Sequence, residues 1–145
     1  MPESVDFFVP GEPHGKGRPR MTRAGHAYTD AKTRDYEAAV RIHALKAMQG
    51  RRPFAGGCIV YLEATFEPPK SASRKKRDAL VGAPVLKRPD IDNIEKSIID
   101  GMNGVVFNDD ALVWGTVCVK RWGVRAGVSV RVAAADTFHD LEPEL

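Results

Sequence analysis

The segment Cys58-Ile-Val-Tyr-Leu-Glu-Ala-Thr-Phe66 decides the fold, because its residues alternate in polarity. In a strand, side chains two positions apart lie on the same face. One face of this segment would then carry Cys58, Val60, Leu62, Ala64 and Phe66. Such alternation is typical of a half-buried strand. The segment therefore predicts a β-sheet with one apolar face.

The chain before this segment predicts a strand and a helix. Val5–Val9 is rich in Val and Phe and is ended by a Pro-Gly pair, as expected of a strand. Thr33 is a plausible N-cap for a helix that runs to about Gln49, with Gly50 as its stop. The small apolar residues of this helix suit packing on a sheet.

The chain after it predicts a second helix and two more strands. Asp92 to about Gly104 places Ile94, Ile98 and Met102 on one helical face. Ala111–Trp122 and Val128–Ala134 are expected to form a hairpin, because a short glycine-containing turn joins them. The order strand, helix, strand, helix, strand, strand predicts an α/β (α+β) fold, with a single mixed β-sheet and flanking helices.

Length and composition indicate one soluble domain. At 145 residues, with 43% hydrophobic and 28% charged residues, residues 1–145 are expected to form a single globular unit. There is no apolar run near the roughly 18 residues of a membrane span and no signal-peptide pattern, so we expect a cytoplasmic protein without a membrane partner. Cys58 and Cys118 lack zinc-site spacing and are expected to be reduced core residues.

The net charge of +3 understates the basic character of the chain. Six acids lie between Asp90 and Asp110, and four more fall in an acidic tail at about residues 135–145. Without these acids and Lys96, 21 basic and nine acidic residues remain, a balance of +12. A cationic body attracts polyanions, of which nucleic acid is the most abundant in a cell.

Two segments concentrate the positive charge. The first, Gly11–Arg20, contains three glycines and two prolines, and is expected to be an exposed loop. Its cations, with one just beyond it, are Lys16, Arg18, Arg20 and Arg23. Such a loop either approaches phosphates through backbone N–H groups or is a solvated turn. Its glycine and lysine spacing does not match a Walker A loop, so we expect no nucleotide cofactor.

The second basic segment, Pro68–Arg88, is the most cationic part of the chain. It contains a single acid, Asp78, and its cations are Lys70, Arg74, Lys75, Lys76, Arg77, Lys87 and Arg88. This segment either binds nucleic acid or forms a short, solvated surface helix. Because it leads directly into the cluster of acids, we favour binding.

The acid cluster opens with Arg88-Pro89-Asp90-Ile91-Asp92. In an extended segment Asp90 and Asp92 would leave on the same face, about 6.6 Å apart. A third carboxylate, from Asp109 or Asp110, returns at the start of the next strand. Converging carboxylates favour a hard divalent cation such as Mg²⁺. The pattern suggests metal-assisted phosphodiester hydrolysis, with Lys96 balancing charge on the phosphate or orienting the nucleophile.

Each acid also has a structural interpretation. Asp92 and Glu95 fit the spacing of a capping box, and Asp92 and Lys96 fit a helical ion pair. Asn108-Asp109-Asp110 fits a turn before a strand. These interpretations leave Asp90 unexplained. An EF-hand loop is excluded, because Glu95 occupies the position that requires Gly.

Lys87-Arg88-Pro89-Asp90-Ile91-Asp92-Asn93-Ile94-Glu95-Lys96, Ile99-Asp100-Gly101-Met102 and Phe107-Asn108-Asp109-Asp110 together resemble the RusA family of Holliday junction resolvases. Gly-Lys-Gly-Arg-Pro-Arg and the stretch from Tyr28 to Tyr36 resemble its phage branch. The resemblance implies a homodimeric endonuclease that cuts symmetric strands of four-way junction DNA with Mg²⁺ or Mn²⁺. By matching position it implies that Asp90, Asp92 and Asp110 bind metal, that Lys96 is the catalytic lysine and that Asp109 is an accessory acid.

Two other functions stay open from the sequence. A non-catalytic branched-DNA-binding or architectural protein would use the same basic segments, with its acids as caps and turns. A metal-dependent nuclease for other branched or single-stranded DNA would use the same acids on a different substrate. Activity on defined DNA structures distinguishes all three.

Overall fold

The structure, a computed structural model, describes residues 3–17 and 20–141 of the chain. The predictions for Arg18 and for the side chain of Arg20 lie outside the described residues. The same holds for Glu142 and Glu144 of the acidic tail.

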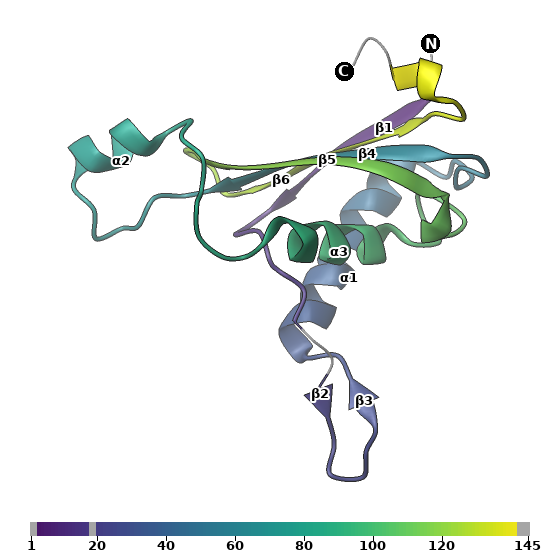
Figure 1. Cartoon of the computed structure of the whole chain (residues 1–145), viewed down its shortest axis with the longest axis horizontal. Helices are drawn as coiled ribbons and strands as arrows, with labels where there is room; N and C mark the ends of the chain where they lie inside the picture. Colours follow the sequence, from purple (N-terminus) through teal and green to yellow (C-terminus); the bar gives the residue numbers. More distant parts are fainter. Residues whose placement is uncertain (1–2, 18–19, 142–145) are drawn as a thin grey trace.

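Four strands form one mixed sheet in the spatial order β1–β6–β4–β5 (Figure 1). Their bounds are Ser4–Pro10 for β1, Cys58–Phe66 for β4, Val113–Trp122 for β5 and Gly127–Ala134 for β6. β6 pairs antiparallel with both β1 and β4, and β4 pairs parallel with β5. The alternation of β4 puts Cys58, Val60, Leu62, Ala64 and Phe66 in the core, as predicted. The predicted fold class is confirmed.

The hairpin predicted for the last two strands is wrong, because β4 lies between β5 and β6. The connection at residues 123–126 crosses the end of β4, where the Gly123 N–H donates to the Phe66 carbonyl at 2.8 Å. The first part of β4 is buried on both faces. Ile59 and Val60 are neighbours in the strand and point to opposite faces, and they are only 4% and 0% exposed. A strand buried in this way occupies the middle of a sheet, while short glycine-containing connections favour hairpins in general.

Two helices, α1 (Ala31–Met48) and α3 (Ile91–Met102), cover one face of the sheet (Figure 1). Their fully buried apolar residues are Val40 and Ala44 from α1 and Ile94, Ile98 and Met102 from α3. Burial of each large apolar side chain contributes about 1.5–3 kcal/mol. The two helices approach closely at Gly101, where a Cβ would lie 2.7 Å from the Cβ of Val40. The core therefore fixes α3, and with it the acids at its start.

The N-cap of α1 is Asp30 rather than the predicted Thr33. Asp30 Oδ1 accepts from the Thr33 N–H at 2.8 Å, and Thr33 lies one turn inside the helix with no exposed surface. Asp and Thr are both common N-cap residues, so residue type alone did not show which of Asp30 and Thr33 caps the helix. The buried Thr33 hydroxyl instead lies 3.0 Å from Nε2 of His14, in the loop that follows β1.

Two appendages project from the body of the molecule (Figure 1). One is a small hairpin of β2 (Arg20–Met21) and β3 (Ala27–Tyr28), which the sequence did not predict. The other carries α2 (Arg74–Leu80), whose N-cap Ser73 accepts from the Lys76 N–H at 3.2 Å. Two short 3-10 helices, η1 (Asp110–Leu112) and η2 (Phe138–Leu141), complete the described chain. No helix among these residues is both long and apolar enough to cross a membrane.

Candidate active site

The acids at the start of α3 are arranged by the helix itself. Asp90 is the N-cap, but its side chain makes no capping hydrogen bond, and Asp92 lies in the first turn. The extended arrangement predicted for Asp90 and Asp92 is therefore wrong, because the helix begins between them at Ile91. Residues two apart on a helix do not face each other. The two residues line one hollow together, but each also lines a second hollow that the other does not reach.

The capping box expected as an alternative for Asp92 is also absent. Glu95, its proposed partner, accepts a hydrogen bond at 2.8 Å from the Thr116 hydroxyl on β5. Asp92 itself has no hydrogen bond or ion pair with any residue between 3 and 17 or between 20 and 141. Its carboxylate is exposed and available to a ligand.

The third carboxylate comes from Asp110. Asp109 is the N-cap of η1, and its Oδ1 accepts from the Ala111 N–H at 3.4 Å. Asp110, half-buried, instead lines a pocket beside α3. The structure therefore distinguishes the two acids that the sequence left open. Asp109 shapes the turn, and Asp110 faces the site.

A pocket of about 270 Å³ brings the main chemical groups together. It is lined by Asp92, Glu95, Lys96, Ile99, Asp100, Asp110, Val113 and Thr116. Helix α3, η1 and β5 each contribute to it. Asp92 and Asp110 lie 18 positions apart in the sequence, and this pocket places them on one surface with Lys96.

Asp90 lies outside this pocket. It lines a hollow of about 910 Å³ together with Asp92, and another of about 660 Å³ together with Lys120. Across the described residues, no three His, Cys, Asp or Glu side chains stand close enough to hold one metal ion. The three aspartates thus do not surround a single point. Carboxylates repel when no cation lies between them, and the helical turn separates Asp90 from Asp92.

The residues of the smaller pocket nevertheless suit a metal ion. Asp92 and Asp110 supply oxygen ligands, and neither is engaged by another residue of the described chain. Mg²⁺ is usually bound through one or two carboxylates, with water and substrate phosphates completing its shell. Two carboxylates on an open pocket fit that donor set.

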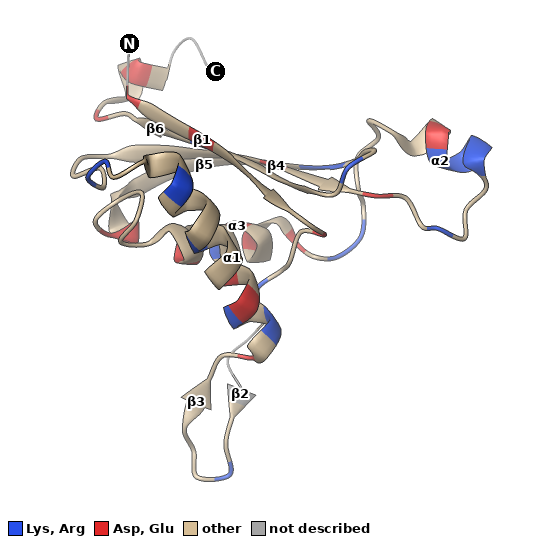
Figure 2. Ribbon diagram, turned by 180° about the vertical axis from the view of Figure 1, so that it is seen from behind, with Lys and Arg blue, Asp and Glu red and all other residues tan. Residues whose placement is uncertain are grey.

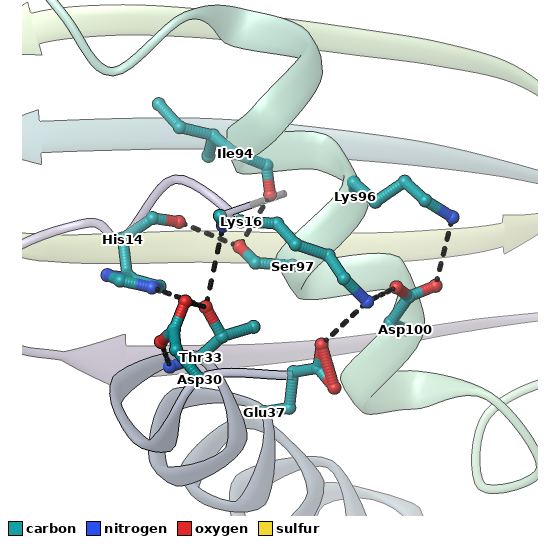
Figure 3. Close-up of polar contacts among 10 residues, drawn as sticks. His14, Lys16, Asp30, Thr33, Glu37, Ile94, Lys96, Ser97 and Asp100 are labelled. Atoms are coloured by element: carbon teal, nitrogen blue, oxygen red, sulfur yellow. Dashed lines mark hydrogen bonds and ion pairs between the residues drawn. The ribbon is translucent and has the colours of Figure 1, made fainter. Parts of the chain in front are cut away.

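Lys96 is connected to a charged network on the protein side of the pocket (Figure 3). Its Nζ lies 3.6 Å from Oδ1 of Asp100, one turn along α3. The other oxygen of Asp100 accepts from Nζ of Lys16, which also donates to Oε1 of Glu37 on α1 at 3.1 Å. Burial lowers the pKa of the Lys16 ammonium, but the hydrogen bonds and charges of Asp100 and Glu37 outweigh it and raise the pKa above its ordinary value.

The loop that carries Lys16 is packed against α3 rather than exposed, so that prediction is wrong for residues 13–17. The Lys16 N–H donates to the Asn93 carbonyl at 3.0 Å, and the Ser97 hydroxyl lies 2.8 Å from the His14 carbonyl. A Cβ at Gly15 would lie 2.6 Å from the Cβ of Pro89. The absence of a side chain at this position lets the loop form one wall of the larger hollow.

The basic segment before α3 is anchored on β5. Lys120 Nζ donates to the carbonyls of Lys87 and Pro89, at 2.7 and 2.9 Å. Lys87 Nζ lies 5.4 Å from the ring centroid of Trp122, a cation–π contact. Arg88 lines both hollows that contain Asp90. This anchoring holds the main-chain segment that enters the site.

The remaining cations project away from the pocket. Figure 2 shows Lys and Arg gathered on α2. The four cations of α2 form no ion pair with any residue of the described chain. They are Arg74, Lys75, Lys76 and Arg77. Arg23 is exposed in the β2–β3 hairpin.

Sequence reasoning missed four residues near the site: Glu95 as a pocket residue, Thr116, Lys120 and Asp100. The four-residue spacing of Asp92, Lys96 and Asp100 was a usable signal, because it puts all three on one face of a helix. Thr116 and Lys120 come from β5, and no local pattern indicates which residues of that strand approach α3.

Comparison with known proteins identifies the family. The family model described as "Endodeoxyribonuclease RusA" matches residues 10–133, which include the whole of both hollows and the pocket. The chain is also 32% identical over 120 residues to "Uncharacterized protein YqaN" of Bacillus subtilis (strain 168), an alignment covering 77% of this chain and 82% of the relative. The chain therefore belongs to the RusA endodeoxyribonuclease family.

Proposed function

We propose that the protein resolves Holliday junctions by metal-dependent hydrolysis, giving symmetric nicks. Its family implies endonuclease activity on junction DNA. The observation that carries the proposal is the pocket in which Asp92, Asp110 and Lys96 meet. The carboxylates of Asp92 and Asp110 are unengaged by the described residues, as expected of groups reserved for a ligand.

Asp92 and Asp110 are the proposed metal ligands, and Mg²⁺ is the proposed ion, with Mn²⁺ as a substitute. Asp90 and Asp109 stay in the proposed metal-binding set, Asp90 from the adjoining hollow that it shares with Asp92. When bound, the ion would polarise the phosphoryl group and lower the pKa of a water molecule.

Lys96 is the proposed catalytic lysine. Its side chain is 62% exposed and lines the pocket beside the two carboxylates. An ammonium there balances negative charge on a bound phosphate and favours the added charge of the transition state. The carboxylates alone would repel the phosphate, so Lys96 also helps DNA to approach.

The DNA surface is proposed to include α2, Lys87, Arg88 and the β2–β3 hairpin with Arg23. Both appendages extend the molecule beyond the pocket (Figure 1), as binding to the arms of a branched molecule requires. Arg18 and Arg20 belong to the set proposed from sequence, and so does Lys16, although its ammonium lies between Glu37 and Asp100. Each phosphate neutralised adds a salt-dependent gain in affinity.

A homodimer is part of the proposal. Two nicks placed symmetrically on a four-way junction are served by two sites related by a two-fold axis. The proposal also includes a cytoplasmic location and membership of the phage branch of the family. The two free cysteines, Cys58 buried and Cys118 half-buried, suit a reducing compartment.

Substitutions in the acids test the proposal. Asp90→Asn, Asp92→Asn and Asp110→Asn should each lower nicking of a synthetic four-way junction in Mg²⁺ by about 100-fold or more. Junction binding should survive or tighten, because a negative charge is removed. Asp35→Asn, at an exposed position of α1 outside the proposed DNA surface, is the matched control, and it should leave nicking unchanged.

The substrates decide between the proposed function and its rivals. Faster cleavage of four-way than of three-way or linear DNA supports a resolvase. Equal cleavage of all three would instead indicate a general metal-dependent nuclease. Binding without nicking by the wild-type protein, at any Mg²⁺ or Mn²⁺ concentration tested, would indicate an architectural protein.

A further inference from the structure

The charge of Lys16 is directed at the protein rather than at solvent. Its ammonium lies between Glu37 on α1 and Asp100 on α3 (Figure 3). The side chains of Lys16, Glu37 and Asp100 are 20%, 23% and 18% exposed, so the three charges are largely removed from water. Charges screened so little by solvent interact more strongly than surface pairs do.

The backbone fixes this lysine as firmly as its side chain does. The Lys16 N–H donates to the Asn93 carbonyl, and the residue two positions earlier is held through Ser97, which is fully buried. The loop that carries Lys16 is therefore held in place on α3 by hydrogen bonds. Reaching a DNA phosphate would require it to abandon two carboxylates.

Asp100 connects Lys16 to Lys96 through its two carboxylate oxygens. One carboxylate oxygen faces Lys16 and the other faces Nζ of Lys96 at 3.6 Å. An exposed ion pair between residues four apart is weak by itself. The position of the Lys96 ammonium therefore depends on how much of the Asp100 charge Lys16 already balances.

We propose that Asp100 is the positioning residue for Lys96, and that Lys16 keeps Asp100 from drawing the Lys96 ammonium away from Asp92 and Asp110. With Lys16 present, two cations face two carboxylates and Lys96 is held loosely beside Asp92 and Asp110. Without Lys16, the negative charges of Asp100 and Glu37 are opposed by Lys96 alone. Its flexible side chain then turns toward them and away from the phosphate. This inference rests on the proposed role of Lys96.

The inference and a direct DNA contact by Lys16 predict opposite results for Lys16→Met. Binding to an immobile four-way junction is measured against salt, without divalent ions, and nicking is measured in single turnovers at saturating protein. Positioning predicts at least a tenfold slower nicking rate at saturating protein, because Lys96 no longer faces the phosphate. A DNA contact predicts that the slope falls by about 0.9, with the nicking rate at saturation unchanged. The second result would overturn the inference.

Two further variants separate positioning from loss of structure. Lys16→Arg keeps the charge and should restore nicking to within a few-fold of wild type. In the double variant Lys16→Met/Asp100→Asn the excess negative charge is gone, so it should nick faster than Lys16→Met alone. Strictly multiplicative effects of the two single changes would contradict an action through Asp100.

A chemical readout is independent of cleavage. The Lys96 amine is labelled with an amine-reactive ester, and its labelling is quantified by peptide mass spectrometry. Labelling of Lys96 should fall several-fold in Lys16→Met and recover in the double variant, because an amine drawn between carboxylates is protected. Unchanged labelling would refute the inference. A wild-type protein that nicks no DNA would refute the proposed function, and the labelling would still decide the arrangement of Lys96.

Discussion

Removing two charges from α2 should flatten the salt dependence of junction binding by a calculable amount. Arg74 and Arg77 are three residues apart on this helix and so share a face. Neither forms an ion pair with another residue of the described chain, so both cations are available to phosphates. Lys75 and Lys76 lie on other faces of this short helix. A DNA duplex that lies along the face of Arg74 and Arg77 would therefore not contact all four cations.

The expected magnitude follows from the release of counterions. Each phosphate contact on duplex DNA contributes about 0.9 to the slope of log affinity against log salt. The variant Arg74→Gln/Arg77→Gln should therefore lose about 1.8 from the slope. Between 50 and 200 mM salt, wild-type affinity should then fall by roughly tenfold more than the affinity of the variant.

The assay is fluorescence anisotropy of a labelled, immobile four-way junction over that salt range, without divalent ions. The matched control is Lys46→Gln/Arg52→Gln, which removes two exposed charges, one in the last turn of α1 and one just after the helix. Its slope should equal that of wild type. An unchanged slope in the α2 variant, or equal losses in both variants, would remove α2 from the DNA surface.

Three further predictions concern stability. Gly101→Ala places a Cβ 2.7 Å from Val40, and overpacking partly offset by helix propensity should lower the free energy of unfolding by about 1 kcal/mol, measured with urea. Ser97→Ala should cost about 1 kcal/mol and speed hydrogen exchange at the loop it holds through His14, whereas unchanged exchange would contradict the clamp. Burial, assisted by the charge of Asp136, raises the pKa of the Cys58 thiol to about 11. The folded state thus holds this proton more tightly, so stability should fall from pH 9 towards 11, and less so in Cys58→Ala.

The sequence predicted the parts of the fold that depend on local patterns. The strand Cys58–Phe66 is found with the predicted bounds, and the helix containing Ile94 and Ile98 buries the predicted face. Strand order was not predictable in the same way. The position of β4 between β5 and β6 depends on which strand buries the most surface in the fold. The sequence of the four residues that connect β5 to β6 does not indicate this.

The site was predictable in its residue types but not in its geometry. Spacing indicated Asp92, Lys96 and either Asp109 or Asp110, and the pocket brings Asp92, Lys96 and Asp110 together. The separation of Asp90 follows from a helix that begins at Ile91, one residue earlier than predicted. The role of Lys16 depended on long-range partners, because an isolated basic loop gives no sign that Glu37 and Asp100 face it across the fold.

The most direct test is the action of the purified protein on a labelled, immobile four-way junction, with Mg²⁺ and with a chelator in excess. We expect paired nicks at symmetric positions in Mg²⁺, none with the chelator, and recovery when Mg²⁺ is restored above the chelator concentration. Nicking that persists without divalent ions would contradict hydrolysis through the Asp92–Asp110 pocket.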